Sequence, residues 1–163
     1  MLADNPAVVA PYILAHGSAK FEFVVDAPLD RAAPFFGPEG ERSWTKREEW
    51  DPHFLYPSMP KDQQGAVFTI VRGGQYSVWV NTLFDLTNGR MQYVVFVPGL
   101  MTTTIDVNLR PDGAKTQATV TYTRTALSPE ANPTVMELSR KDASQASEWS
   151  DAIAGMLRTQ PIR

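Results

Sequence analysis

Alternating apolar and polar residues predict a series of β-strands through the centre of the chain. The alternation has the period of two that is typical of strands, and it recurs in runs at 65–72, 75–86, 90–97, 101–110 and 115–126. Short turn sequences join successive runs: Gly73-Gly74, Asn88-Gly89, Pro98-Gly99 and Asp112-Gly113. Glycine suits tight hairpin turns because it adopts positive φ at little steric cost. The pattern therefore predicts an antiparallel meander.

A further strand and a short helix are predicted before the meander. Residues 20–25 alternate, which places Phe21, Phe23 and Val25 on one face of a strand. Pro28 suits the first turn of a helix, where no N–H donor is needed, and Gly37-Pro38 ends that helix. The irregular, proline-rich stretch that follows contains one more short strand, near residues 49–56.

The C-terminal part of the chain predicts one long amphipathic helix. Ser128 and Pro129 suit its start, and Pro133 delays or restarts it. Apolar residues then recur at helical spacing: Val135, Leu138, Trp149, Ile153, Met156 and Leu157. The polar stretch 139–148 marks a kink or an exposed section. A helix of about 25 residues is about 37 Å long and matches a ten-residue strand of about 33 Å, so we predict that it covers the sheet.

The last hairpin predicts which side of the sheet is covered. With Asp112-Gly113 as the turn, Pro111 pairs with Ala114, and Met101 lies opposite Arg124. One face is then mostly apolar and the other polar, whereas a slip of one residue would mix the two. The elements together predict an α+β fold. In it a curved antiparallel sheet of six to seven strands wraps around the long C-terminal helix, with one or two short helices after the first strand.

The link at Pro98-Gly99 decides which residues of the preceding strands face inward. A two-residue turn carries Phe96 next to Met101 on the inner face, together with Trp79 and Asn81. A three-residue turn that includes Leu100 brings another set inward instead: Val78, Val80, Tyr93 and Val95. We favour the two-residue turn because two-residue hairpins are the commonest.

The length of 163 residues predicts one domain. We place it at residues 18–163, after an N-terminal arm at 1–17. The mildly apolar part of this arm, 7–15, is interrupted by Pro11, follows no Lys or Arg, and is shorter than the roughly 20 residues of a membrane span. The sequence therefore predicts a cytoplasmic protein without a signal peptide or membrane span.

Charge and composition exclude several classes of function. The net charge is −3, with 15 basic and 18 acidic residues mixed along the chain, so a basic face for nucleic acid is not expected. The chain has no cysteine, which excludes disulfides and thiolate metal sites. His16 and His53 are the only histidines, and neither has a second ligand at helical spacing. We predict no metal and no cofactor.

Several segments resemble the START/Bet v 1-like (SRPBCC) superfamily, in particular its uncharacterised bacterial branch. They are the opening strand and helix at 20–31, Trp50-Asp51-Pro52, Phe54-Leu55-Tyr56-Pro57, the strand at 120–127, and Glu148-Trp149. The resemblance extends from about residue 18 to 158 and implies the helix-grip fold, with a cavity for apolar molecules between sheet and helix. Members of the superfamily bind lipids, sterols or polyketides, and others are cyclases or activate the Hsp90 ATPase, so the fold alone does not decide the function.

Arg124 is the most informative candidate for a polar group in this cavity. The predicted register places it on the apolar face, where an unpaired guanidinium would be costly. It either anchors a carboxylate or carbonyl of a ligand, or forms a structural ion pair with Glu148 or another acid near the helix. A third alternative is that its head reaches water.

The other candidates are mostly aromatic. Trp79 either lines the cavity or packs in the core, and Asn81 would be a buried amide that needs a partner. Trp50, Tyr56 and Trp149 either close one end of the cavity or hold the proline-rich loop. The full predicted ligand-binding set is Trp50, Tyr56, Phe68, Trp79, Asn81, Phe96, Tyr122, Arg124, Trp149 and Ile153.

We predict a non-enzymatic protein that binds a small apolar, lipid-like or aromatic molecule between sheet and helix, and a homodimer is compatible with the sequence. One alternative is a cyclase- or aromatase-like enzyme, whose acid or base would come from Arg124, Tyr122, Tyr93 or His53. The other is an interaction module similar to the Hsp90-activating branch, with an exposed apolar patch and no ligand-sized cavity. No catalytic residue is assigned.

Overall fold

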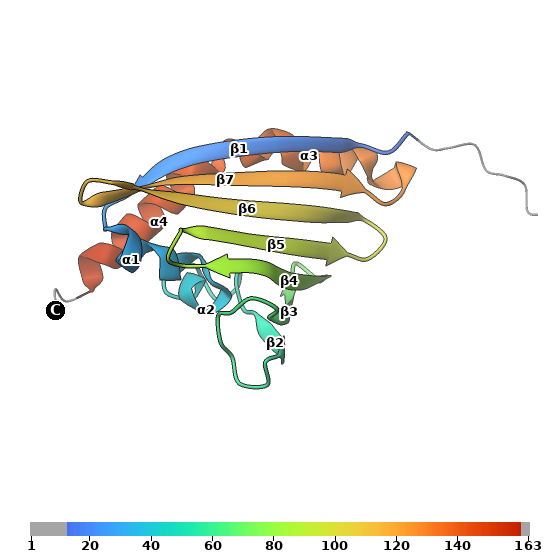
Figure 1. Ribbon diagram of the computed structural model, residues 1–163. Coiled ribbons are helices and arrows are strands. Elements are labelled where there is room, and N and C mark those ends of the chain that lie inside the picture. The colour runs from blue at the N-terminus through green and yellow to red at the C-terminus, as the bar shows by residue number, and fades with distance from the viewer. Residues whose placement is uncertain (1–12, 161–163) are drawn as a thin grey trace, which may run out of the picture.

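Within residues 13–160, which the computed structural model describes, seven strands form one antiparallel sheet in the order β1-β7-β6-β5-β4-β3-β2 (Figure 1). The strands are β1 (His16–Val25), β2 (His53–Tyr56), β3 (Val67–Arg72), β4 (Gln75–Asp85), β5 (Arg90–Val97), β6 (Met101–Asp112) and β7 (Lys115–Ala126). The helices are α1 (Leu29–Ala32), α2 (Pro38–Glu41), α3 (Asn132–Asp142) and α4 (Gln145–Thr159), with 3₁₀ turns at Ala33–Phe36 and Pro129–Ala131. This arrangement confirms the predicted α+β architecture.

The C-terminal helix is divided into two. Helices α3 and α4 run along one side of the sheet, against β1 and β7 (Figure 1). The chain leaves the helical path at Ala143 and Ser144, inside the polar stretch where a kink was predicted. Pro133 lies in the first turn of α3, which follows the separate 3₁₀ turn at Pro129–Ala131. The helix therefore restarts in the turn that contains Pro133, which was one of the two predicted alternatives.

The first strand is longer than predicted. β1 begins at His16, which pairs with Thr125 of β7, and it continues to Val25. Residues 16 and 17 therefore belong to the sheet rather than to the predicted arm. Residues 1–12 of that arm lie outside the described residues.

The register of the β6–β7 hairpin differs from the predicted one by two residues. Asp112 pairs with Lys115, so the turn residues are Gly113 and Ala114, and Gly113 has φ +60°. As a result Arg124 lies opposite Thr103 and not opposite Met101. The predicted faces survive because a shift of two residues keeps every side chain on its own side of the sheet.

The prediction that Phe96 faces the cavity is wrong. Val97 pairs with Met101, which leaves a three-residue link, so Tyr93 and Val95 face inward and Phe96 is 44% exposed on the outer face. Trp79 nevertheless faces inward, opposite Val95.

Neither the two-residue nor the three-residue link predicts every inward-facing residue of β4 and β5, because β4 contains a β-bulge. Asn81 pairs with Tyr93, but Leu83 pairs with Gln92, so Thr82 is an extra residue on β4. The connection from Asp85 to Arg90 also has four residues rather than two. An extra residue reverses the alternation of faces beyond it, and the sequence of a strand does not reveal it.

The core lies between the inner sheet face and the C-terminal helices. It contains, among others, Phe21, Phe23, Val25, Ile105, Val107, Leu109, Val120, Ile153 and Met156. Phe21 and Phe23, predicted to share a face of the first strand, contact Trp149 of α4 edge-on at centroid distances of 5.4 and 6.3 Å. Burial of each large apolar side chain contributes about 1.5–3 kcal/mol, which ties α4 to β1.

Candidate functional site

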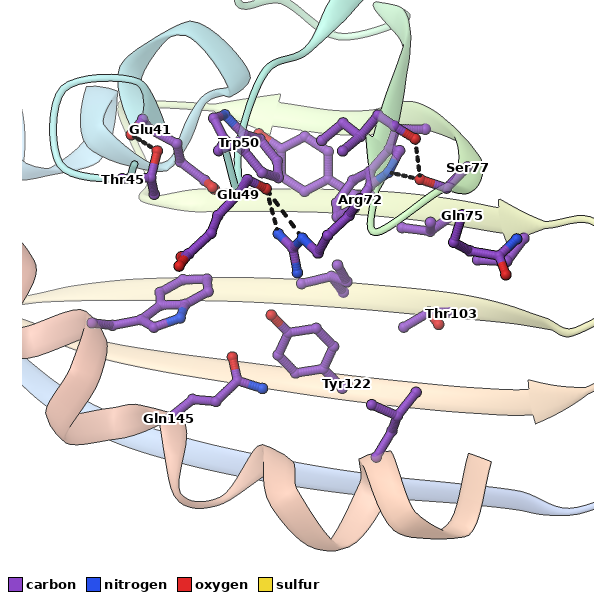
Figure 2. Close-up of a pocket in the computed structure, with 18 of the residues that line it drawn as sticks. Glu41, Thr45, Glu49, Trp50, Arg72, Gln75, Ser77, Thr103, Tyr122 and Gln145 are labelled. Atoms are coloured by element: carbon purple, nitrogen blue, oxygen red, sulfur yellow. Dashed lines mark hydrogen bonds between the residues drawn. The ribbon is translucent and has the colours of Figure 1, made fainter. Parts of the chain in front are cut away.

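A cavity of about 680 Å³ lies between the inner face of the sheet and the C-terminal helices (Figure 2). Strands β3 to β7 form one wall, α3 and α4 another, and α2 with the loop after it forms the third. The apolar lining residues are Trp44, Trp50, Ile70, Trp79, Tyr93, Val95, Val97, Met101, Ile105, Val107, Tyr122, Leu138, Trp149 and Ala152. A cavity of this size and lining is typical of sites for small organic molecules.

Five of the predicted site residues lie on the cavity wall: Trp50, Trp79, Tyr122, Arg124 and Trp149. Phe68 and Ile153 are buried in the core and are not part of the lining. Phe68 supports the wall from behind, because its ring stacks on Trp79 at 5.7 Å and meets Trp50 edge-on at 6.2 Å.

The other three predicted residues lie away from the cavity. Tyr56 is 56% exposed on the edge strand β2, and Phe96 faces outward on β5. Asn81 is fully buried at the bulge of β4. With its amide oriented to satisfy its surroundings, the nitrogen donates to the main-chain carbonyls of Leu83 and Gln92 at 2.6 and 3.2 Å. Of the partners that such an amide could have, a ligand group, water or backbone, the structure provides backbone, and Asn81 stabilises the bulge.

Three of the four tryptophans in the wall, Trp44, Trp50 and Trp79, donate their indole N–H to other groups of the protein. Trp50 Nε1 donates to the Pro38 carbonyl at 2.8 Å, and Trp79 Nε1 donates to Ser77 Oγ at 2.9 Å. Trp44, a residue that the sequence did not single out as a candidate, packs on Trp149 at 5.2 Å and donates to the Phe35 carbonyl. These rings therefore offer apolar surface to the cavity.

Arg124 forms the structural ion pair that was one of its alternatives. Its Nη1 lies 2.5 Å from Asp142 Oδ2, and Gln145 Nε2 donates to the other oxygen of Asp142 at 3.2 Å. The guanidinium carbon also lies 4.6 Å from the centre of the Tyr122 ring. Burial raises the pKa of Asp142, and the positive charge of Arg124 opposes that rise. Arg124 Nε is buried without a hydrogen-bond partner among the described residues.

Glu41 is a cavity residue that the sequence did not reveal. It is the last residue of α2 and only 9% exposed. Its main-chain carbonyl accepts a hydrogen bond from Thr45, but its carboxyl oxygens have no partner within residues 13–160. Burial raises the pKa of Glu41 well above its usual range; the charge of Asp62 adds to the rise and that of Arg72 opposes it. In its protonated form this acid can donate a hydrogen bond into the cavity.

The two tyrosines of the wall differ in their hydrogen bonding. Tyr93 donates its hydroxyl hydrogen to the Phe36 carbonyl at 2.7 Å. The Tyr122 hydroxyl has no such partner in the described part of the chain and points into the cavity (Figure 2). Burial raises the pKa of both hydroxyls, so both are neutral donors at physiological pH.

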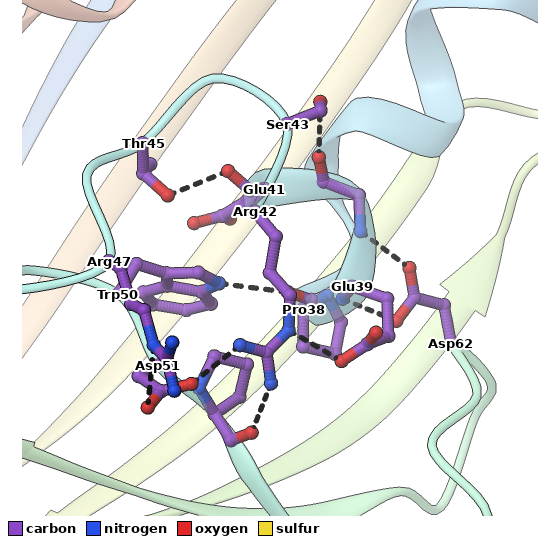
Figure 3. A network of polar contacts seen from close by, with 12 residues as sticks. Pro38, Glu39, Glu41, Arg42, Ser43, Thr45, Arg47, Trp50, Asp51 and Asp62 are labelled. Carbon is purple, nitrogen blue, oxygen red and sulfur yellow. Dashed lines mark hydrogen bonds and ion pairs between the residues drawn. The ribbon is translucent and has the colours of Figure 1, made fainter.

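Residues 38–52, which we call the cap segment, are held over the cavity by polar contacts (Figure 3). The Asp62 carboxylate accepts from the main-chain N–H groups of Glu39 and Gly40 at 2.8 and 3.1 Å. Arg42 binds Glu39 at 2.8 Å and Asp51 at 2.6 Å. Asp51 is thus engaged by Arg42, and the structure gives no acid–base pair between it and the exposed His53.

A further contact joins the cap segment to the sheet at the rim of the cavity, where the exposed charged residues of the lining also lie. Arg72 of β3 donates from Nε and Nη2 to the Glu49 carbonyl at 3.1 and 2.8 Å (Figure 2). The exposed charged residues of the lining are Lys46, Glu49, Arg72 and Glu148. Within residues 13–160 no group of acidic or histidine side chains is placed to hold a metal ion, and no helix is long and apolar enough to cross a membrane.

Solved structures share this architecture at low sequence identity. Norcoclaurine synthase from Thalictrum flavum, in complex with dopamine and hydroxybenzaldehyde, is 12% identical with a TM-score of 0.68, over 92% of this chain and 91% of that chain. Ara h 8.0201 is 14% identical with a TM-score of 0.63, over 90% of this chain and 100% of that chain. The chain has the Bet v 1-like, helix-grip fold.

CalU16 from Micromonospora echinospora has the same Bet v 1-like fold, at 14% identity and a TM-score of 0.56, over 90% of this chain and 85% of that chain. No protein-family model and no curated protein matches the chain. At identities of 12–14% the likeness establishes the fold and not a shared activity. The resemblance to START/Bet v 1-like proteins is confirmed as a fold, and the bacterial branch stays a prediction.

Proposed function

We propose that the chain binds a small apolar or aromatic molecule in the cavity between sheet and helix, and that it does so without changing the molecule chemically. The observation that carries this proposal is the cavity itself, about 680 Å³ in volume and lined mainly by aromatic and aliphatic side chains. Four tryptophans on its wall, Trp44, Trp50, Trp79 and Trp149, have rings suited to stack on a flat ligand.

The predicted site residues then fall into two groups. Trp50, Trp79, Tyr122 and Trp149 contact the ligand directly. Arg124 acts through the ring of Tyr122, since its guanidinium is engaged by Asp142 and lies 4.6 Å from that ring. A cavity of this volume speaks against the interaction-module alternative, for which no ligand-sized cavity was predicted.

Titration with N-phenyl-1-naphthylamine, an uncharged apolar probe, tests the proposal. Binding is expected to raise the emission of the probe and quench tryptophan emission, at one site per chain. Native mass spectrometry of protein purified from its own host is expected to show a bound small molecule. The proposal fails if the purified protein is repeatedly empty and also leaves the probe emission unchanged.

One observation favours an acid–base enzyme as a second candidate. Glu41 places a buried carboxyl with a raised pKa on the cavity wall, and such groups are common at active sites. The test is incubation of a bound aromatic ketone in D₂O, followed by mass spectrometry. Deuterium incorporation next to the carbonyl that depends on Glu41 would support this candidate, and equal incorporation in Glu41→Gln would count against it.

A further inference from the structure

Two groups on the cavity wall, the Glu41 carboxyl and the Tyr122 hydroxyl, have no hydrogen-bond partner among residues 13–160. The Glu41 carboxyl comes from α2 and the Tyr122 hydroxyl from β7, and both project into the space between the cap segment and the C-terminal helices (Figure 2). Neither makes a side-chain hydrogen bond to the described residues. Their neighbours differ: the indole N–H of Trp50 and the hydroxyl of Tyr93 each donate to a main-chain carbonyl. Both groups face the open cavity, so a ligand bound there can supply their hydrogen-bond partners.

The surroundings of Glu41 offer it no partner and disfavour its charge. The charge of Arg72 lowers the pKa of the Glu41 carboxyl, but two nitrogens of Arg72 donate to the Glu49 carbonyl instead. Asp62 adds negative charge nearby and is itself fixed by main-chain N–H groups of α2. Burial and Asp62 act in the same direction and raise the pKa of the carboxyl, which favours the protonated form that can donate a hydrogen bond.

The environment of Tyr122 also makes this residue an uncharged hydrogen-bond donor. Its hydroxyl is a neutral donor, because burial raises its pKa. The nearby guanidinium of Arg124 is occupied by Asp142. The deep part of the cavity therefore presents hydrogen-bond donors on a mainly apolar surface. The positive charge of Arg124, which lines it below the rim, is balanced by Asp142, although Arg124 Nε has no partner among the described residues.

We propose that Glu41 and Tyr122 donate hydrogen bonds to acceptor oxygens of the ligand, and that the ligand is a neutral aromatic carbonyl compound, such as a ketone, ester or lactone. This inference rests on the proposed binding function and adds the chemical class. Carbonyl oxygens can accept from such donors without bringing a charge into the apolar interior. A carboxylate is disfavoured because its desolvation is not offset there by a positive charge that Asp142 does not already balance.

The pH dependence of binding follows from the same contact. Deprotonated Glu41 cannot donate, so affinity for a ketone falls as pH rises through the pKa of Glu41. Other groups around it also carry charge or titrate: Asp62 before β3, Arg72 on β3, Tyr93 on β5, Tyr122 on β7, Lys46 and Glu49 in the cap segment, and Glu148 on α4. Glu41→Gln separates the contribution of Glu41 from theirs, because it keeps a donor and removes the titration.

Two probes of nearly equal shape test the inference. 2-Acetylnaphthalene has a carbonyl and 2-ethylnaphthalene does not, and both are measured by displacement of N-phenyl-1-naphthylamine. Glu41→Leu and Tyr122→Phe are each expected to weaken 2-acetylnaphthalene about 3- to 10-fold, the usual worth of one hydrogen bond. Both variants should leave 2-ethylnaphthalene within about 2-fold. Glu41→Gln should keep the affinity for the ketone, and Glu48→Gln, at an exposed acid of the cap segment outside the lining, serves as the control.

The outcomes separate this inference from the binding function. If the variants weaken both naphthalenes equally, or if 2-naphthoate binds as tightly as the ketone, the cavity does not recognise a neutral carbonyl and the inference is overturned. It is also overturned if wild-type affinity for the ketone does not fall with pH, or falls equally in Glu41→Gln. In each of these cases the binding function stands. If no probe, including N-phenyl-1-naphthylamine, binds to the wild-type protein, the binding function itself fails.

Discussion

Arg124 on β7 and Asp142 at the end of α3 form a buried ion pair, with 2.5 Å between Nη1 and Oδ2. The pair joins the sheet to the helix where α3 and α4 meet. Its side chains are only 8% and 1% exposed. A partner removed from such a pair leaves an uncompensated charge in the interior, which costs far more than the pair contributes.

We therefore expect Asp142→Asn to lower the free energy of unfolding by about 3–5 kcal/mol. The double variant Arg124→Met/Asp142→Leu should be much closer to wild type, because no charge is left buried. Urea denaturation monitored by circular dichroism measures both. Glu137→Gln, which removes the exposed pair with Lys141, is the control and should change stability by less than about 0.5 kcal/mol. Equal losses in the single and double variants would contradict this account.

Adjacent residues of β5 allow a matched test of the cavity. Val95 faces inward and lines it, whereas Phe96 lies on the outer face. Val95→Trp is expected to fill part of the cavity and weaken N-phenyl-1-naphthylamine at least about 10-fold, since a ligand then competes with a buried ring. Phe96→Trp should bind the probe like wild type. Thermal unfolding of both variants checks that the sheet is intact, and a comparable loss in both would place the probe outside the cavity.

How far the sequence could predict this site depends on the kind of signal. The faces of β1, β6 and β7 followed from the period of two, because long regular strands repeat it many times. Phe96 was misplaced because a three-residue link and a bulge each shift the alternation by one residue, and neither has a distinct sequence pattern here. Arg124 was found because a charge on an apolar face stands out, although its partner Asp142 is 18 residues away.

Glu41 shows where the sequence signal ends. Helix α2 has four residues, too few for an amphipathic pattern to show which side faces inward. Its orientation comes from contacts distant in sequence, chiefly those of Asp62 with the main chain of Glu39 and Gly40. The sequence alone does not reveal these contacts, and without them Glu41 is expected to be a solvated acid in a charged stretch.

Gly40 is expected to be essential for the position of the cap segment. A Cβ atom at this residue would lie 1.8 Å from the main-chain oxygen of Pro34, and backbone at that distance has to move. Gly40→Ala should therefore destabilise the protein by more than about 1 kcal/mol and weaken N-phenyl-1-naphthylamine binding. Gly155→Ala in α4 is the control, because its Cβ would meet only the end of Arg158 at 3.7 Å. That change should stabilise the helix by up to about 1 kcal/mol, and a stable Gly40→Ala that binds normally would refute the prediction.

Glu41 should also make the stability of the fold dependent on pH. The pKa of Glu41 is raised in the folded state, so folding favours its protonated form. The contribution of this protonated form to stability is complete below the unfolded pKa of about 4.3 and is lost as pH rises through the folded pKa. Glu41→Gln should not differ from wild type near pH 4 but should be more stable at pH 8. We expect a gain of about 1 kcal/mol or more, since a tenfold change in an acid dissociation constant corresponds to about 1.4 kcal/mol. Urea denaturation across this range measures the difference, with Glu48→Gln as control. A difference that does not vary with pH would mean that folding does not raise the pKa of Glu41.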